Sequence, residues 1–535
     1  MLIFFFIESF LEFLMESPST KILKGFLRFP RTITTKEEYL KTRKQGLLLR
    51  ENSINLRTAH NLLQDTLTEK FNSRCFGSFD YISNMEEEDQ DYENLIVQLK
   101  KMKKYFHTVI AFRGNRYLSN YTMRNLCSAM YTNKSLKSFE TRFIECFKLQ
   151  DEGFSKLGKV FLKQKRLTRI DCYFYCLMHI TEKGFARLGG YLTWVRNLKD
   201  LELYFGDYAR EWQHITDQAI VRFLGYISKL DRLERLKLTM HGFRNMSDES
   251  LFGYYDYFSK LKNLKRLELL FRHRNMFTEN GIAKIAKLVS ELQNLEFLNL
   301  DFRLSDYPGH KGFVAISDAL EKLPKLRVLK LHFEKCLGIQ TQSLEYFSSK
   351  IISLTGLEKL QLNFPRCENI TNIVSIGRPL SQLKNLRIFE IDITECRRLT
   401  DPILIEFLNL LKGLTQLTTL ALTLNNLEKT KGQILQPLLT LLSTFHDLRE
   451  LNLGIGGFEI DHESLNAFLA LSKDLKELKE YKLEITPEDG IIMENLDARN
   501  LSVSFKPPYV TEIKKEEPTT ETKGQNNDDM SSLFE

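Results

Sequence analysis

The chain has few cysteines, and none of them forms a C-x-x-C pair. Its 535 residues contain eight, scattered from position 75 to position 396. Small secreted folds that lack a sufficient core are instead dense in cysteine, because disulfides hold them together. The scarcity therefore excludes a disulfide scaffold and predicts a reducing compartment, the cytoplasm.

The chain also lacks a run of about 18 charge-free apolar residues, the length that a membrane-spanning helix needs. The apolar start, MLIFFFIESFLEFLM, carries Glu8 and Glu12 and has no Lys or Arg before it, unlike a secretory signal. These carboxylates share one stripe of a helix. We expect no transmembrane span, and an amphipathic cap or membrane-surface helix at 1–15. An extracellular recognition domain, suggested by the apolar start and by sequons at Asn120 and Asn369, is the alternative.

Motifs that carry known chemistry are missing as well. The sequence contains no Gly-rich phosphate loop, H-E-x-x-H, G-x-S-x-G or kinase signature set. Ten histidines are scattered without metal-ligand spacing, and a net charge of +7 is too dilute over this length to indicate nucleic acid by itself. We therefore predict a protein that is not an enzyme and has no cofactor, no metal and no nucleic-acid partner.

What the sequence has is a repeat. The pattern L-x-x-L-x-L-x-F recurs as LERLKLTM at 233–240, LKRLELLF at 264–271, LEFLNLDF at 295–302 and LRVLKLHF at 326–333. Its starting positions run from 136 to 478, mostly 31 residues apart. Leucines two apart point to the same side, so each copy predicts a short strand with one buried face.

A second signature lies between the predicted strands. A Ser or Thr is followed by an acid or amide and then by apolar residues at helical spacing, as in ITDQAIVRFL at 215–224 and LTDPILIEFL at 399–408. The hydroxyl can cap a helix, the carboxylate suits its positive end, and Pro402 fits the first turn. Strand and helix units in regular alternation predict a solenoid with a parallel sheet inside and helices outside.

The repeat resembles the leucine-rich-repeat superfamily, particularly its ribonuclease-inhibitor-like branch. This resemblance implies an α/β horseshoe with its parallel β-sheet on the concave face and its α-helices on the convex face. We expect about 13 repeats over 91–505, an N-terminal helical cap or adaptor region over 1–90, and a disordered polar tail over 506–535.

Some positions depart from the consensus of that superfamily. The consensus amide that joins neighbouring turns is retained at Asn425 but replaced elsewhere, and the residue before that site is apolar in every unit from Phe143 to Ile485. A hydrophobic ladder is therefore expected in place of an amide ladder. Cys336, Cys367 and Cys396 share one position in three successive units, and we expect small buried residues there rather than metal ligands.

Residues between the ladder leucines are expected to face the concave side. Tyrosine, arginine and large apolar residues there are the types favoured at interface hot spots. The candidate partner-binding residues are Tyr173, Tyr204, Arg235, Lys237, Arg266, Leu270, Phe297, Lys330 and His332. Arg235 and Arg266 are expected side by side, with Lys237 diagonal to Arg266. Like charges this close repel one another unless Glu268 or a partner offsets them, which favours a protein partner with an acidic segment.

Two other functions are compatible with the resemblance. FEIDITECRRLTDPIL at 389–404 is similar to the cysteine-containing repeats of F-box proteins, which implies a substrate receptor of a ubiquitin ligase, although 1–90 contains no convincing F-box. The GTPase activators of nuclear transport have similar units, but the asparagine-rich strand ends on which they depend are missing. The preferred interpretation is a non-enzymatic recognition scaffold.

Overall fold

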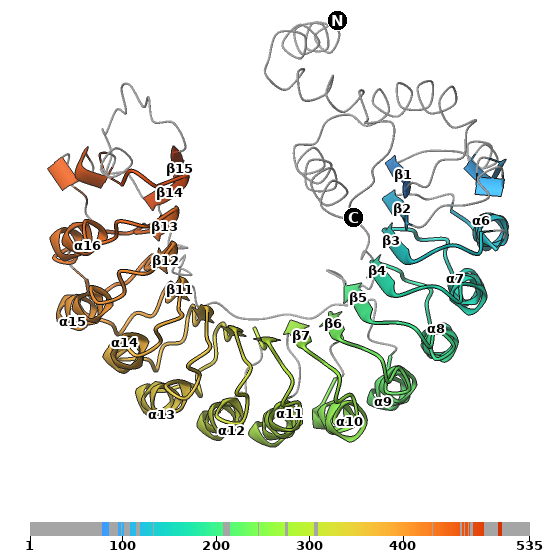
Figure 1. Ribbon diagram of the computed structural model, residues 1–535, viewed down its shortest axis with the longest axis horizontal. Coiled ribbons are helices and arrows are strands. Elements are labelled where there is room, and N and C mark those ends of the chain that lie inside the picture. Colours follow the sequence, from blue (N-terminus) through green and yellow to red (C-terminus); the bar gives the residue numbers. More distant parts are fainter. Residues whose placement is uncertain are drawn as a thin grey trace, which may run out of the picture.

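The computed structural model is a horseshoe whose strands line the inner wall and whose helices form the outer wall (Figure 1). It describes residues 78–84, 501–505 and most of 95–485, apart from short stretches such as 101–106, 207–214 and 304–308. Strand and helix alternate along the chain, and each element packs on its counterpart in the next unit. The α/β solenoid predicted from the repeat is confirmed.

Within the described residues, fifteen strands form one all-parallel sheet in sequence order. They are β1 (Ser78–Asn84), β2 (His107–Arg113), β3 (Ser138–Ile144), β4 (Arg169–Tyr175), β5 (Asp200–Gly206), β6 (Arg235–His241), β7 (Arg266–Arg272), β8 (Phe297–Asp301), β9 (Val328–His332), β10 (Lys359–Asn363), β11 (Ile388–Asp392), β12 (Thr419–Thr423), β13 (Glu450–Gly454), β14 (Glu480–Ile485) and β15 (Leu501–Phe505). Equivalent residues of successive repeats face one another, so the register of the sheet follows the period of the sequence.

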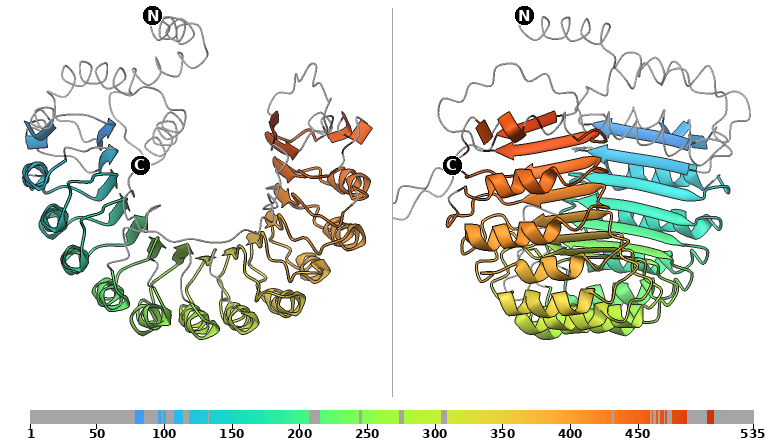
Figure 2. Two further views of the ribbon diagram at one scale, coloured as in Figure 1. Left: turned by 180° about the vertical axis from the view of Figure 1, so that it is seen from behind. Right: turned by 60° about the vertical axis from the view of Figure 1, so that its left-hand side comes forward.

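The helices cover the outer face of this sheet (Figure 2). Those described are α6 (Asn120–Met130), α7 (Asp151–Lys163), α8 (Glu182–Leu192), α9 (Asp217–Ile227), α10 (Asp248–Phe258), α11 (Glu279–Glu291), α12 (His310–Leu320), α13 (Thr341–Ile351), α14 (Val374–Leu380), α15 (Asp401–Leu411) and α16 (Leu435–Leu442). The predicted hydroxyl caps are confirmed at Thr181, Thr216 and Thr278, whose side chains accept hydrogen bonds from the first turns of α8, α9 and α11. Pro402 lies in the first turn of α15, as predicted.

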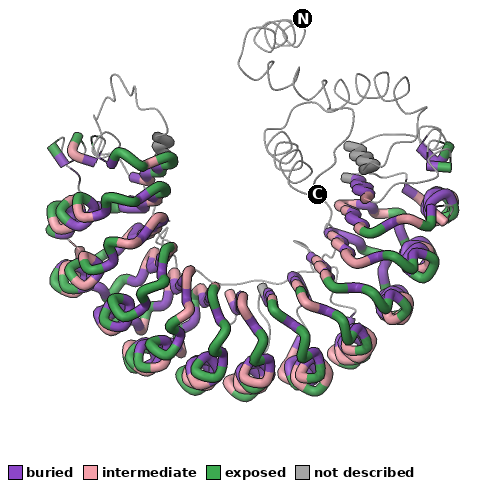
Figure 3. Tube along the Cα trace, in the orientation of Figure 1, coloured by how far each residue is buried: buried purple, intermediate pink, exposed green. Residues whose placement is uncertain are grey.

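The core is one continuous layer between the sheet and the helices. Leu236, Leu267 and Leu298 pair in register on β6, β7 and β8, and each of them is 0% exposed. The burial pattern repeats in successive units from β2 to β14 (Figure 3). Because each unit buries its leucines against its neighbours, the core has no boundary between units.

The predicted hydrophobic ladder is confirmed as a stack of phenylalanine rings. Phe143 stacks on Phe174 with 6.1 Å between ring centroids, and Phe174 stacks on Phe205 with 5.4 Å. A second stack runs from Phe271 through Phe302, Phe333 and Phe364. Asn425 retains the consensus role, because its Oδ1 accepts the backbone N–H of Gly456 at 2.7 Å.

The ends of the chain differ from the sequence prediction in one respect. Strand β1 lies upstream of residue 91, where the predicted solenoid begins, and pairs in parallel with β2. A segment assigned to the N-terminal region therefore continues the sheet, because its backbone pairs with β2 although its sequence does not carry the period. The predicted helices of 1–77 and the polar tail of 506–535 lie outside the described residues.

Candidate functional site

The concave face presents the residues that alternate with the buried leucines. Arg235 of β6 pairs in register with Arg266 of β7, which pairs with Phe297 of β8. Tyr173 of β4 pairs with Tyr204 of β5. The sheet therefore brings most of the predicted site residues together on one inner wall, in the order that the repeat predicts.

Two tyrosines form the aromatic part of this wall. The rings of Tyr173 and Tyr204 stack with 4.0 Å between centroids and 15° between planes. Both side chains are half-buried, and the Arg142 guanidinium lies 6.0 Å from the Tyr173 ring centroid. Tyr204 is fixed at its outer end, where its hydroxyl lies 3.3 Å from Nδ1 of His241. We call Tyr173 and Tyr204 the tyrosine pair.

Beside the tyrosine pair lies a row of ion pairs, which we call the ion-paired row. Arg235 contacts Asp200 at 2.7 Å, Lys237 contacts Glu202 at 2.5 Å, and Arg266 contacts Glu268 at 2.7 Å, all between nitrogen and oxygen atoms. The register confirms that Arg235 and Arg266 lie side by side, with Lys237 opposite Glu268 and therefore diagonal to Arg266. The offset expected from Glu268 is present at Arg266, and Asp200 and Glu202 offset Arg235 and Lys237.

The two signs of charge lie at different depths in the ion-paired row. The Arg235 side chain is 54% exposed and the Arg266 side chain 41%, whereas their partners Asp200 and Glu268 are 13% and 9% exposed. Asp200 and Glu268 therefore form a lower layer, and the arginines that they hold form the surface, whereas Lys237 and Glu202 are about equally exposed. A molecule that approaches this wall meets arginine N–H groups first.

Phe297 completes the exposed part of the site. The Arg266 guanidinium lies 3.5 Å from the Phe297 ring centroid, and Lys330 Nζ lies 6.0 Å from it. An arginine held by both a carboxylate and an aromatic face has lost most of its freedom before any partner arrives. Desolvation and the nearby Lys359 lower the pKa of Lys330.

Two predicted site residues are not available on this surface. Leu270 is 7% exposed, and the structure also buries His332. Leu270 lies between Thr239 and Asp301, which are themselves buried. Side chains converge on the inner side of a curved sheet, so a residue between filled neighbours is covered. The prediction of Leu270 and His332 as contact residues is therefore wrong.

The sequence analysis missed residues at the N-terminal side of the site. Arg142 and Glu140 of β3 continue the same inward rows and form an ion pair of 3.2 Å. Tyr175 and His241 are buried, each 7% exposed, and contact Tyr204. They come one residue after the repeat frame, on strands that are seven residues long rather than five. Following the repeat frame upstream to β3 would have identified the first two residues, but strand length is not encoded in the leucine spacing.

Asp171 has an unusual electrostatic environment in this wall. It pairs in register with Glu140 and Glu202, so three acidic residues lie on neighbouring strands. Burial, together with these two carboxylates, raises the pKa of Asp171 to about 7. Arg169 opposes the shift, with its Nη2 3.5 Å from Asp171 Oδ2. The carboxyl group of Asp171 therefore changes its charge near neutral pH.

The cysteine column forms a ladder of weak hydrogen bonds. Cys336, Cys367 and Cys396 are each 0% exposed. The Sγ of Cys367 donates to the carbonyl of Phe333 at 3.1 Å, and the Sγ of Cys396 donates to that of Phe364 at 3.1 Å. Each thiol thus donates a hydrogen bond to the backbone carbonyl of the ladder phenylalanine in the previous unit. This hydrogen bond takes the place of the consensus amide as the polar link between the two units.

Two features are absent from the part of the chain that the structure describes, a metal-binding group and a membrane-spanning helix. There, no group of three or more His, Cys, Asp or Glu side chains could hold a metal ion. No helix in that part is long and apolar enough to cross a bilayer.

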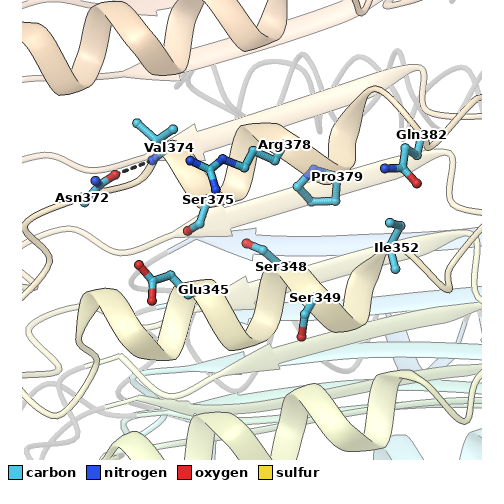
Figure 4. A pocket seen from close by; sticks show the side chains of 10 residues that line it. All are labelled: Glu345, Ser348, Ser349, Ile352, Asn372, Val374, Ser375, Arg378, Pro379 and Gln382. Carbon is cyan, nitrogen blue, oxygen red and sulfur yellow. Dashed lines mark hydrogen bonds between the residues drawn. The ribbon is translucent and has the colours of Figure 1, made fainter.

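A groove opens on the opposite, convex side, between α13 and α14 (Figure 4). Helix α14 has seven residues and α13 eleven, and a hollow of about 410 Å³ lies between them. Its lining is mixed, with the polar Ser348 and Arg378 beside the apolar Ile352, Val374 and Pro379. None of the predicted site residues reaches it, so the groove is separate from the concave site.

The fold places the chain in the class of leucine-rich-repeat solenoids. No protein-family model and no curated protein matches the sequence. Among solved structures, the chain is similar to one from the crystal structure of the Rad7 and Elc1 complex in yeast, at 15% sequence identity and a TM-score of 0.44. The match covers 89% of this chain and 99% of that chain. So distant a likeness carries no argument about function, and the class rests on the repeat and the register of the sheet.

Proposed function

We propose that the protein is a non-enzymatic recognition scaffold that binds a protein partner on its concave sheet, at the tyrosine pair and the ion-paired row. One observation carries the proposal: partly exposed tyrosine and arginine side chains are gathered on one wall and held by stacking and by ion pairs. Tyrosine and arginine are the residue types enriched at binding hot spots. Because the sheet already fixes them, little side-chain entropy is lost on binding.

We further propose that the bound segment of the partner is acidic. Arg235 and Arg266 are much more exposed than the carboxylates that they contact, so their remaining N–H groups face the solvent. Carboxylates of a partner can accept hydrogen bonds from these groups in the planar geometry that arginine favours. The binding is expected to weaken as ionic strength rises, because the exposed part of the attraction is screened.

The test is affinity capture of partners with the full chain, followed by a binding measurement for each captured protein. Replacing Tyr173 and Tyr204 by Ala is expected to weaken association at least about tenfold, because the pair forms the rigid aromatic surface. The matched control replaces Tyr121 and Phe252, exposed aromatics of the convex helices α6 and α10. Control binding should stay within about twofold of wild type.

A second set of variants tests the charge of the partner. Changing Arg235, Lys237 and Arg266 to Gln removes the cations without placing new carboxylates against Asp200 and Glu268. Affinity should fall and the remaining binding should lose most of its salt dependence. If the tyrosine variant binds the partner more weakly and the glutamine variant does not, the proposal of a concave binding site holds and the proposal of an acidic partner segment is wrong.

The alternative function, a substrate receptor of a ubiquitin ligase, predicts an additional partner. A ligase adaptor would then be captured through 1–90, where the adaptor region is predicted. Removing 1–90 would abolish adaptor capture and leave binding at the tyrosine pair unchanged. If all capture is lost with 1–90 and none with the tyrosine variant, the concave-face proposal is wrong.

Two finer assignments accompany the proposal. We place this recognition in the cytoplasm, which the seven described cysteines support, because all of them are free thiols. We also assign the repeats to the ribonuclease-inhibitor-like branch, which the full helices support, such as α7 with thirteen residues. Any mobility shift after glycosidase treatment of the native protein would contradict the cytoplasmic assignment.

A further inference from the structure

The turns that lead from each helix to the next strand form one edge of the solenoid. Because the strands are parallel and in register, all of these turns lie where the strands begin. Figure 1 looks along the strands, so this edge is one of the two broad sides of the horseshoe. It is a layer of adjacent turns rather than a groove.

Five consecutive turns of this layer, within residues 131–265, are strongly basic. Across 131–137, 161–168, 192–199, 227–234 and 258–265, the acidic residues are Asp231 and Glu234, whereas every one of these turns carries at least two cations. We define the basic edge as the exposed cations of these turns that form no ion pair with a described residue. They are Lys134, Lys163, Lys165, Arg166, Arg196, Lys229, Arg232 and Lys260.

An exposed tryptophan lies within the basic edge. Counted back from the first leucine of each strand pattern, Lys163, Trp194, Lys229 and Lys260 occupy the same position in four successive units. Trp194 is 60% exposed, so cations border an indole that the core does not need. Lys229 and Lys260 rest on Tyr226 and Tyr257, at 5.8 Å and 5.4 Å from the ring centroids.

The opposite edge carries both signs of charge. The helices begin there, and their first turns carry acidic residues such as Asp151, Asp217 and Asp248. An anionic surface would therefore attract the basic edge more strongly than the opposite edge. The charge distribution therefore selects one orientation of the whole solenoid.

We infer that the basic edge docks on an anionic lipid surface, with Trp194 entering the headgroup region. Cations spread over several adjacent turns match a planar array of headgroups better than a single extended strand of phosphates. Indole rings favour the interface between lipid and water, where the apolar ring is buried and its N–H stays wet. This docking goes beyond the proposed recognition function, because the edge is separate from the concave wall and leaves that wall open.

Flotation of the full chain with vesicles tests the inference. Vesicles of phosphatidylcholine with about 30 mol% phosphatidylserine should bind the protein, and vesicles of phosphatidylcholine alone should not. Changing Lys163, Lys165, Arg166, Arg196 and Lys260 to Gln is expected to reduce the partition coefficient at least about tenfold. Trp194→Ala should reduce it several-fold without changing the net charge.

The control removes the same number of cations from the other edge, by changing Lys183, Lys311, Lys335, Arg398 and Lys429 to Gln. Its binding should remain within about twofold of wild type. Equal losses in both variants would mean that net charge alone acts, and the inference would be wrong. Binding of a single-stranded RNA probe by the basic edge, with no vesicle binding, would overturn it in favour of nucleic acid.

Discussion

Asp217, in the first turn of α9, accepts two hydrogen bonds from Ser247, the residue that caps α10. The backbone N–H of Ser247 lies 3.0 Å from Oδ1 of Asp217, and its hydroxyl lies 2.5 Å from Oδ2. The same contact joins Asp151 to Thr181 and Asp248 to Thr278. The acidic residue of the helix signature therefore has two roles. It lies at the positive N-terminal end of its own helix, and it accepts hydrogen bonds from the residue that caps the next helix.

Replacing Asp217 by Ala should reduce the free energy of unfolding by about 1 to 3 kcal/mol, because the donors of Ser247 lose their acceptor. Chemical denaturation measures this loss. The control is Asp256→Ala, an exposed acid of α10, for which a change within about 0.5 kcal/mol is expected. Equal effects of the two substitutions would show that the contact between helices contributes nothing.

Leu298 tests the continuity of the core. It is 0% exposed and pairs with Leu267 and Leu329 of the neighbouring strands. Leu298→Asp should cost several kcal/mol, because a charge is buried without a partner, and the loss should spread to the adjacent units. Hydrogen exchange should show lost protection in β7, β8 and β9 together. With Gln293→Asp, in the exposed turn before β8, protection should be unchanged.

The leucine spacing was sufficient to predict the architecture, and physics explains why. A side chain such as Leu267 is stable only in the core. Because successive side chains of a strand point to opposite faces, burial of Leu267 fixes the direction of its neighbours. The rows that contain Arg235, Arg266 and Phe297 follow from this, and they were predicted correctly. The direction of these side chains depends on the sequence of a single repeat, so the repeat pattern is sufficient to predict it.

Exposure on the concave side could not be predicted in the same way. Leu270 and His332 point inward, as the pattern indicates, but curvature and the size of neighbours such as Asp301 decide whether water reaches them. Ion pairing between Arg235 and Asp200 likewise depends on side-chain reach across strands. Both are properties of several units together, whereas the motif describes one unit.

The cysteine column gives a chemical prediction. Burial raises the pKa of the Cys367 thiol to about 12, and burial also raises that of Cys396. Cys367 and Cys396 therefore form few thiolates at neutral pH, and Cys336 is just as fully buried, so all three should resist a thiol reagent in the folded protein and react after unfolding. Replacing all three by Ala should cost roughly 1 kcal/mol per site.

Metal analysis completes the test of this column. Purified wild-type protein and the triple alanine variant should contain the same amount of zinc, since each Sγ is already used as a donor to a carbonyl. Stoichiometric zinc that is lost in the variant would contradict the interpretation of these cysteines as packed residues. Rapid modification of the native thiols would contradict it as well.

Asp171 makes the stability of the protein depend on pH. Its pKa is about 7 in the folded chain, against about 3.9 for an unperturbed aspartate. Between these values the folded state binds more protons than the unfolded state, so this group lowers the free energy of unfolding as pH rises from about 4 to about 7. Its destabilising effect is complete above pH 7, where the buried carboxylate lies charged between Glu140 and Glu202.

Asp171→Asn should remove this dependence. At pH 8 the variant should be more stable than wild type by roughly 1 to 3 kcal/mol, because the amide needs no ionisation in the buried site, and the difference should vanish near pH 4. Denaturation midpoints across this range measure the difference, with Asp231→Asn in an exposed turn as the control. A difference that stays constant with pH would mean that Asp171 is ionised throughout, held by Arg169 more strongly than its acidic neighbours oppose it.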